Sequence, residues 1–199
     1  MSTVASTARD RKRAATRRQI ADAAARFATE HGIAATTADD IADAAGVGRA
    51  TLFRHFESKE LAIATGLSDV AVFVLSSAIM ALPASLGPFE AIRTAQAVLG
   101  EDFETNREMF LDQAHLSRSS PSMWAWTLHV YVDWEIAIAN AVAPRYRDLA
   151  PDDPRPRMLG ALTMAASRLA CDEWLAGAGT GDLPALTQRY LTALGSTLT

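Results

Sequence analysis

Hydrophobic residues recur along the chain at the three- and four-residue spacing of an α-helix, and no stretch alternates convincingly as a half-buried strand would. The spacing of Ile20, Ala24 and Phe27 predicts a first helix, which the glycine at Gly32 ends. Similar stripes, separated by caps and breaks, continue to the end of the sequence. The pattern therefore predicts an all-α fold of about nine helices.

Helix caps divide the segment after Gly32 into three further helices. Thr37 is the expected N-cap of the second helix, and Asp40 at its third position completes a capping box, with Asp in place of the usual Glu. Gly46 ends this helix, and a very short third helix follows. Ser58 is expected to cap a fourth helix that runs to Pro83.

The stretch PASLGP at 83–88 is the clearest break in the chain, and a second module is expected to start near it. The later elements expected are helices at 89–106, 107–119 and 123–142, a stiff loop at 150–156, a helix ending at 175, a glycine loop at 177–181, and a last helix from 184.

Composition restricts the class of protein. Of the 199 residues, 49% are hydrophobic, which is enough for a core, and the single cysteine, Cys171, excludes an internal disulfide and fits a reducing cytoplasm. The N-terminus lacks the apolar core of a signal peptide. The longest largely apolar run, 70–82, has 13 residues, short of the roughly 20 that cross a bilayer. We therefore expect a cytoplasmic protein with no membrane partner.

Charge is distributed unevenly along the chain. Residues 1–59 carry a net charge of +3, and the other 140 residues carry −7. Six basic residues lie between Arg9 and Arg18, opposed by Asp10 alone. A basic end on an acidic protein indicates a polyanionic partner for that end. The alternative is a solvated arm that binds nothing.

The stretch AGVGRATLFRHFESKEL, residues 45–61, has the pattern of a helix-turn-helix, with a glycine-containing turn leading into a short polar helix. Leu52 and Phe56, four residues apart, are expected to pack inward. Arg49, at the start of this helix, then lies where such helices contact base edges in the major groove. Lys59 and the helix start after Ser58 suit a DNA phosphate.

The motif TADDIADAAGVGRATLFRHFESKE, residues 37–60, resembles the TetR/AcrR family of bacterial transcriptional regulators. The resemblance runs through about residues 14–74 and implies a three-helix DNA-binding domain there, with the helix-turn-helix at about 37–56. It also implies a helical domain at 75–199 that dimerises and binds a small effector. Most members of the family are repressors that leave a palindromic operator on double-stranded DNA when the effector binds.

The resemblance, together with the basic pattern, gives the expected DNA contacts. Position 37 contacts the backbone in this family, positions 48–51 face bases or nearby phosphates, and positions 53, 55 and 59 touch phosphates. Phe53 stands where tyrosine is commoner, so it has no hydroxyl to donate. The alternatives are that Phe53 belongs to the core, Arg54 is a solvated charge, and His55 is a cap. The expected set is Arg17, Arg18, Thr37, Gly48, Arg49, Ala50, Thr51, Phe53, Arg54, His55 and Lys59.

Aromatic residues gather in the acidic second half, where all four tryptophans lie between residues 124 and 174. Two apolar stripes on the helix at 123–142 predict a helix buried on two faces. An apolar site with few polar groups suits a small hydrophobic effector; the alternative is that the aromatic residues are ordinary core. The expected lining is Phe103, Phe110, His115, Trp126, His129, Val130, Trp134 and Trp174.

Two acid–histidine pairs, Asp112 with His115 and His129 with Asp133, each share a helical face. Such pairs hold a metal when two helices bring them together. The alternatives are surface contacts or polar lining of the effector site. We expect surface pairs or lining, and no metal or other cofactor.

Small residues on the helix ending at 175, and an apolar stripe on the last helix, favour a four-helix interface in a homodimer. A two-fold axis then places two reading helices about one DNA turn apart. The alternative is that these faces complete the monomer core. The expected interface residues are Gly160, Ala161, Ala165, Leu186, Tyr190 and Leu194.

An enzyme is the least favoured function. Cys171 has no histidine near it in sequence, and the glycine loop at 177–181 follows no strand, so it is no dinucleotide loop. The remaining alternative is an activator, or a DNA-binding protein that needs no ligand, with the same fold.

Overall fold

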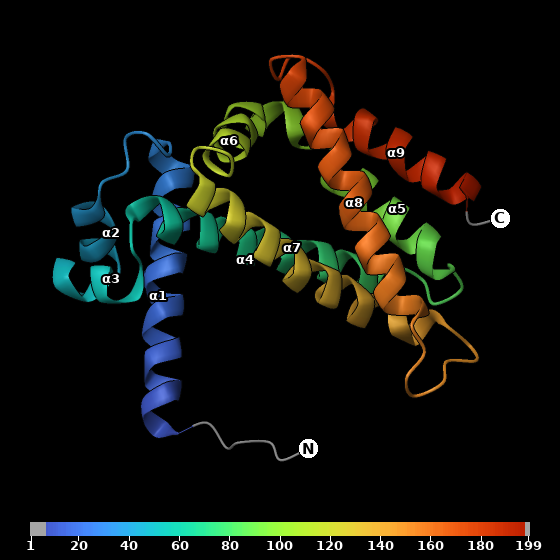
Figure 1. Ribbon diagram of the computed structural model, residues 1–199, viewed down its shortest axis with the longest axis horizontal. Helices are drawn as coiled ribbons and strands as arrows, with labels where there is room; N and C mark the ends of the chain where they lie inside the picture. Colours follow the sequence, from blue (N-terminus) through green and yellow to red (C-terminus); the bar gives the residue numbers. More distant parts are fainter. Residues whose placement is uncertain (1–6, 198–199) are drawn as a thin grey trace. The chain divides into compact units, whose positions relative to one another are not determined.

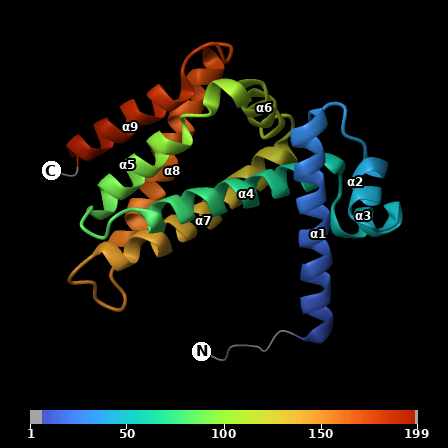
Figure 2. The ribbon, with the colours of Figure 1, turned by 180° about the vertical axis from the view of Figure 1, so that it is seen from behind.

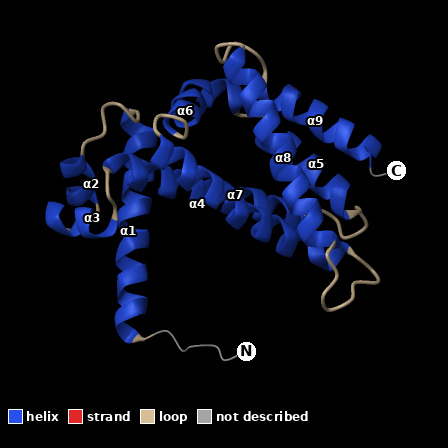
Figure 3. Ribbon diagram, in the orientation of Figure 1, coloured by secondary structure: helices blue, strands red, loops and turns tan. Residues whose placement is uncertain are grey.

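The computed structural model describes residues 7–197, and within that range it contains nine α-helices, one 3-10 turn and no strand (Figure 3). The all-α expectation is confirmed. The chain divides into two compact units, with the division between Val70 and Ala71 inside helix α4, Lys59–Ala81.

The first unit contains three helices besides the first half of α4: α1 (Ala8–His31), α2 (Ala38–Ala44) and α3 (Arg49–His55) (Figure 1). Its core is formed by side chains that are at most 1% exposed: Ile20, Ile41, Leu52, Phe56 and Ile63. Each helix thus contributes apolar residues at helical spacing, as the sequence pattern predicts.

The second unit contains the second half of α4, then α5 (Pro88–Leu99), α6 (Phe103–Leu116), α7 (Pro121–Val142), the 3-10 turn η1 (Ala143–Arg145), α8 (Arg155–Ala176) and α9 (Leu183–Thr197). Helices α7 and α8 pack together, and α9 lies beside α8 and α5 in both views of the ribbon (Figures 1 and 2).

Helix α5 ends at Leu99 and α6 begins at Phe103, four residues before the expected start at Arg107. Gly100 caps α5 with its amide donating to the Gln96 carbonyl at 3.1 Å, and Phe103 then begins α6. The expected helix at 89–106 is therefore wrong, because a glycine stop lies within it. The expected domain at 75–199 ends in two residues, 198 and 199, that lie outside the described range.

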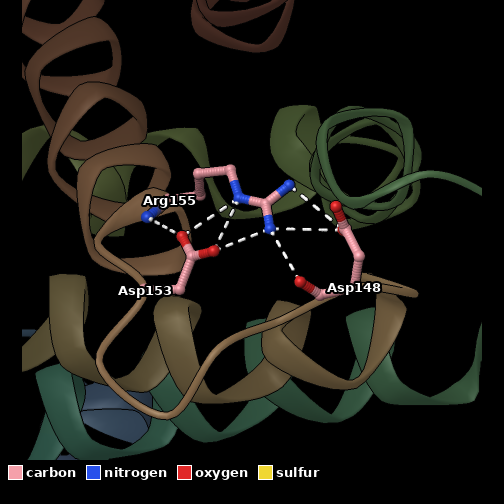
Figure 4. Close-up of polar contacts among 3 residues, drawn as sticks. All are labelled: Asp148, Asp153 and Arg155. Atoms are coloured by element: carbon pink, nitrogen blue, oxygen red, sulfur yellow. Dashed lines mark hydrogen bonds and ion pairs between the residues drawn. The ribbon is translucent and has the colours of Figure 1, made fainter.

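Arginine side chains fix the loop around η1. Arg145 donates to the carbonyl oxygens of Leu82 and Pro83 at 2.9 and 2.8 Å, which closes the end of α4. Arg155 bonds the carboxylates of Asp153 and Asp148 at distances from 2.6 to 3.2 Å (Figure 4). These carboxylates, Asp153 first, raise the pKa of Arg155 above its usual value. The loop predicted to be stiff is held by charge as well as by proline.

By length and composition, α4 is apolar enough to cross a membrane. Long core helices of soluble proteins meet the same criteria, and Ile63, Leu75 and Ile79 of α4 are at most 1% exposed. On its other side Val70, Phe73 and Met80 are 52%, 71% and 63% exposed, so α4 is buried along one side.

Candidate nucleic-acid interface

Helices α2 and α3 form the helix-turn-helix. Thr37 caps α2 by accepting from the Asp40 amide at 3.2 Å, while the Asp40 carboxylate accepts from the Thr37 amide at 2.9 Å, so the predicted capping box is confirmed. Gly46 has a φ of 61° in the turn, a conformation that glycine adopts without strain. Gly48 then caps α3.

The outer face of α3 is available to a partner. Leu52 and Phe56 are at most 1% exposed and fix the helix to the unit. Phe53 is 42% exposed, so the alternative that it belongs to the core is wrong. The exposed or half-buried residues on this helix are Arg49, Ala50, Thr51, Phe53, Arg54 and His55.

Arg49 is held by a residue that the sequence analysis did not single out. Its Nη1 lies 2.8 Å from Oδ1 of Asp39 on α2, and its guanidinium lies 5.2 Å from the centre of the Phe53 ring. The two charged side chains are 57% and 67% exposed, so the pair faces water. An exposed pair of this kind exchanges partners at little cost.

A surface hollow of about 350 Å³ lies beside α3, between the starts of α2 and α4. Lys59 is half-buried there and donates to the Thr36 carbonyl at 2.5 Å, while Ser58 accepts from the Leu61 amide and caps α4. Helix starts and an ammonium group favour an anion such as phosphate. The hollow is lined by Thr37, Ala38, Arg49, Phe53, Glu57, Ser58, Lys59 and Glu60.

Arg17 and Arg18, both predicted to contact DNA, differ in their surroundings. Arg17 stacks on the Phe56 ring at 4.0 Å and donates to the His55 carbonyl at the end of α3, and burial lowers its pKa. Arg17 extends the buried stripe of α1 by one turn and thus connects α1 to α3. Arg18 is exposed, so its charge is the more accessible of the two.

Two ionisable groups of the helix-turn-helix have lowered pKa values: His55 at the end of α3 and Asp40 in the first turn of α2. Burial, followed by the charge of Arg54, lowers the pKa of His55. The Thr37 side-chain and backbone hydrogen bonds lower the pKa of Asp40. Burial and the neighbouring arginine charges thus favour the neutral ring of His55 in the free protein.

Phe103, Phe110 and Trp174, predicted to line an effector site, gather in one apolar cluster of the second unit. Trp174 is 1% exposed, its ring lies 5.7 Å from that of Phe103, and its Nε1 donates to the Gly181 carbonyl at 2.8 Å. Both side chains pack in this cluster, and Trp174 also lines a hollow of about 430 Å³ between α8 and the start of α9, so their role in an effector site stays a prediction.

Helix α7 is not buried on two faces as expected, because Leu128 on one predicted stripe is 45% exposed. Trp126, Val130 and Trp134 on the other stripe are half-buried. His115 on α6 and His129 on α7 are exposed, so the structure removes both from an interior lining. In residues 7–197 no three His, Cys, Asp or Glu side chains gather in a group that could hold a metal ion.

Gly160, predicted for a dimer interface, packs inside the second unit. A Cβ at this position would lie 2.4 Å from the Glu135 carbonyl oxygen on α7, so glycine is needed for the close approach of α7 and α8. We correct that prediction. The other five predicted residues, Ala161, Ala165, Leu186, Tyr190 and Leu194, are half-buried in the single chain.

Comparison with known proteins supports this geometry. The family "Bacterial regulatory proteins, tetR family" matches residues 20–61, and "MftR C-terminal domain" matches residues 86–199. The chain is similar to the HTH-type transcriptional regulator TcmR of Streptomyces glaucescens, with 32% identity covering 94% of this chain and 85% of TcmR. It is 28% identical to the putative mycofactocin biosynthesis transcriptional regulator MftR of Mycobacterium tuberculosis, covering 82% and 84% of the two chains.

The fold is also similar to solved structures. Thermus thermophilus FadR, a TetR-family transcriptional repressor in complex with lauroyl-CoA, aligns with a TM-score of 0.63 and 24% identity over 89% of this chain and 92% of FadR. A putative TetR-family transcriptional regulator from Mesorhizobium loti aligns with a TM-score of 0.53 and 16% identity over 94% and 98% of the chains. These relatives are transcriptional regulators and not enzymes. The chain therefore belongs to the tetR family of bacterial regulatory proteins, whose members bind DNA.

Proposed function

We propose that the protein is a cytoplasmic, homodimeric repressor that binds a palindromic operator through α3 and leaves it when a small hydrophobic effector binds the second unit. The observation that carries the proposal is the outward face of α3, where Arg49 and Arg54 are exposed above the buried Leu52 and Phe56. A short helix fixed by its inner face and presenting arginine outward has the chemistry for reading guanine in the major groove.

The DNA contacts divide by their surroundings. Arg49, Ala50 and Thr51 at the start of α3 are proposed to face base edges, with Gly48 offering its backbone amide. Phosphate contacts are proposed for Arg18, Arg54, His55 and Lys59, with the backbone near Thr37 beside them. Phe53 supports these contacts by packing, since its ring lies beside the Arg49 guanidinium.

A dimer is supported by an apolar stripe on α8. Met158 and Leu169 are 57% and 42% exposed, and Leu162 and Ala165 between them are half-buried. Their spacing of four, three and four residues is that of a helix pairing with another along its length. With the apolar face of α9, this stripe forms the proposed four-helix interface.

The interface is tested by charge insertion. Leu169→Glu should convert the dimer to a monomer in sedimentation velocity, because a carboxylate would be buried against the partner. The matched control is Val98→Glu on α5, a residue 51% exposed outside the stripe, which should leave the dimer intact. A Leu169→Glu protein that sediments as the wild-type dimer contradicts this interface.

The regulatory proposal is tested by selecting bound sequences from random DNA with the purified protein. A palindrome with half-site centres about 10 base pairs apart, or a multiple of a helical turn, is expected from a two-fold dimer. An effector that quenches tryptophan fluorescence should release this operator over the same concentration range. If no motif is selected, sequence-specific binding is contradicted. If the effector quenches the fluorescence but does not release the operator at any of these concentrations, the effector-released repressor is contradicted.

A further inference from the structure

Between the two apolar clusters of the second unit lies a group of polar side chains that the sequence analysis did not single out. The first cluster includes Met164 of α8, with Tyr131 of α7 packed against it, and the second includes Trp174, with Cys171 packed against it. On α8, residues 167 and 168 lie between these two apolar positions. This stretch of α8 therefore carries polar groups where the helix passes from one cluster to the other.

Two arginines meet at one carboxylate in this group. Arg118, which follows α6, donates to Oδ1 of Asp172 at 2.6 Å, and Arg168 of α8 donates to Oδ2 of the same residue at 3.1 Å. The single carboxylate of Asp172 faces the guanidinium groups of both Arg118 and Arg168, so these three side chains have a net positive charge.

The two arginines differ in how firmly they are held. Arg118 also donates to the Ala114 carbonyl at 3.2 Å and to the Ser117 hydroxyl at 3.0 Å, and its guanidinium lies 5.4 Å from the Trp124 ring. Arg168 bonds Asp172 through Nη1, and its side chain is 36% exposed. Arg168 therefore retains donors, in a fixed place, that an incoming anion can accept.

A buried hydroxyl lies beside Arg168 in the chain. The Ser167 Oγ is buried and has no hydrogen-bond partner within the part of the chain that the structure describes. The hydroxyl of Thr163, one turn earlier on α8, is satisfied by the Leu159 carbonyl at 2.8 Å. A buried hydroxyl without a partner is unfavourable, so a group from outside the chain is expected to complete it.

The neighbouring phenol supports a site for an anion. Burial raises the pKa of Tyr131, and the charges of Arg118 and Arg168 act in the opposite direction on it. The phenol thus remains a neutral hydrogen-bond donor, and both arginines act on it electrostatically. The hydrogen-bond donors of Tyr131 on α7, Arg168 on α8 and Arg118 after α6 thus outnumber the single carboxylate, that of Asp172.

We propose that Arg118, Arg168 and Ser167 bind the anionic group of an amphipathic effector, whose apolar part packs along the side of α7 that carries Trp124 and Tyr131. The charge-assisted bonds to two arginines select an anionic head over a neutral or cationic one. The inference rests on the proposed effector site and narrows its ligand from any small hydrophobic molecule to an apolar molecule that carries a carboxylate or phosphate.

The first experiment compares head groups on the unaltered protein. Dodecanoate, dodecyl phosphate, dodecanol and dodecyltrimethylammonium are titrated below micelle formation while tryptophan fluorescence is recorded in the absence of DNA. Both anions should bind at least about tenfold more tightly than dodecanol, as expected for one charged hydrogen bond. A preference for only one anion identifies the carboxylate or the phosphate as the head group. Equal affinity for dodecanol and both anions would overturn the proposal.

The second experiment locates the head group. Arg168→Gln should abolish the preference for the anions over dodecanol, while Arg157→Gln should keep it. Arg157 is the matched control, because it is also on α8 and also pairs with one carboxylate, that of Glu135 at 3.2 Å. A preference that survives Arg168→Gln places the anion elsewhere and overturns the assignment.

Ser167→Ala distinguishes a binding hydroxyl from a structural one. The variant should lower the affinity for the preferred anion severalfold and raise the Tm of the free protein, because the unpartnered hydroxyl is removed. A lowered Tm with unchanged affinity would contradict the role of Ser167. Operator release is measured separately: anions that bind through Arg168 without releasing DNA support this site and contradict the proposed regulation.

Discussion

The pair formed by Arg49 and Asp39 gives a prediction whose magnitude follows from the structure. The atoms lie 2.8 Å apart, but the side chains are 57% and 67% exposed, so the pair is worth about 0.2–1 kcal/mol in the free protein. A bidentate contact from arginine to guanine is worth about 1–3 kcal/mol. Arg49→Ala should therefore weaken binding to the cognate operator by about 5- to 150-fold.

Asp39→Asn should act in the opposite direction. Removal of the carboxylate frees Arg49 in the unbound protein and removes one negative charge from the interface. Binding to the cognate operator should tighten by up to about fivefold, which corresponds to 1 kcal/mol, because Arg49 no longer has to leave a carboxylate to reach its base.

The assay is a double-mutant cycle on cognate and scrambled duplexes at several salt concentrations. With alanine at position 49, Asp39→Asn should tighten binding less, because no guanidinium remains to be released from the carboxylate. Arg93→Ala is the control, since Arg93 pairs with Glu90 on α5 at 2.9 Å in the second unit. Equal loss of affinity for both duplexes in Arg49→Ala, or a gain of affinity in Asp39→Asn that is the same with and without Arg49, refutes the reasoning.

Three further predictions concern the first unit. Lys59→Ala should weaken all duplexes alike and reduce the log–log salt slope by about 0.9, with Lys59→Arg restoring it; a slope that does not change removes Lys59 from the phosphate contacts. Arg17→Ala should lower the free energy of unfolding in urea by about 1–2 kcal/mol, because it loses the Phe56 stacking and the His55 carbonyl. Exposed Arg18→Ala should change that energy by less than about 0.5 kcal/mol, and equal effects of the two variants would contradict the assignment. The pKa of His55 is lowered from 6.5 in the folded protein. The stability that depends on its neutral ring should therefore be present above pH 6.5 and lost as the pH falls through the folded pKa. His55→Gln should reduce this loss, measured as urea midpoints across this pH range.

The helix-turn-helix could be predicted because its signals are local. Thr37 and Asp40 lie three residues apart, so their capping box depends on no other part of the chain. Leu52 and Phe56 lie four residues apart, which fixes the buried side of α3 and leaves Ala50 and Arg54 on the opposite, exposed side. Where every determinant falls within a turn or two, spacing alone predicts orientation.

The second unit was less predictable because apolar residues surround several of its helices. Leu128 belongs to an apolar stripe and is nevertheless exposed, since spacing does not say which of two apolar faces meets a neighbour. Gly160 was assigned to a partner subunit when its small size serves α7 in the same chain. A small residue indicates close helix approach, but the identity of the approaching helix is a tertiary fact.

The arginines show most clearly why residue type alone does not define a DNA contact. Arg17 and Arg49 lie in the basic part of the chain, but Arg17 is half-buried on an aromatic ring and Arg49 is exposed against a carboxylate. An arginine that reads DNA must leave its partner in the free protein, so a weak exposed pair suits that role and a buried tie does not. The ease with which each arginine can leave its partner therefore distinguishes these two positions. It depends on burial and on partners that lie 10 or more residues away in the sequence.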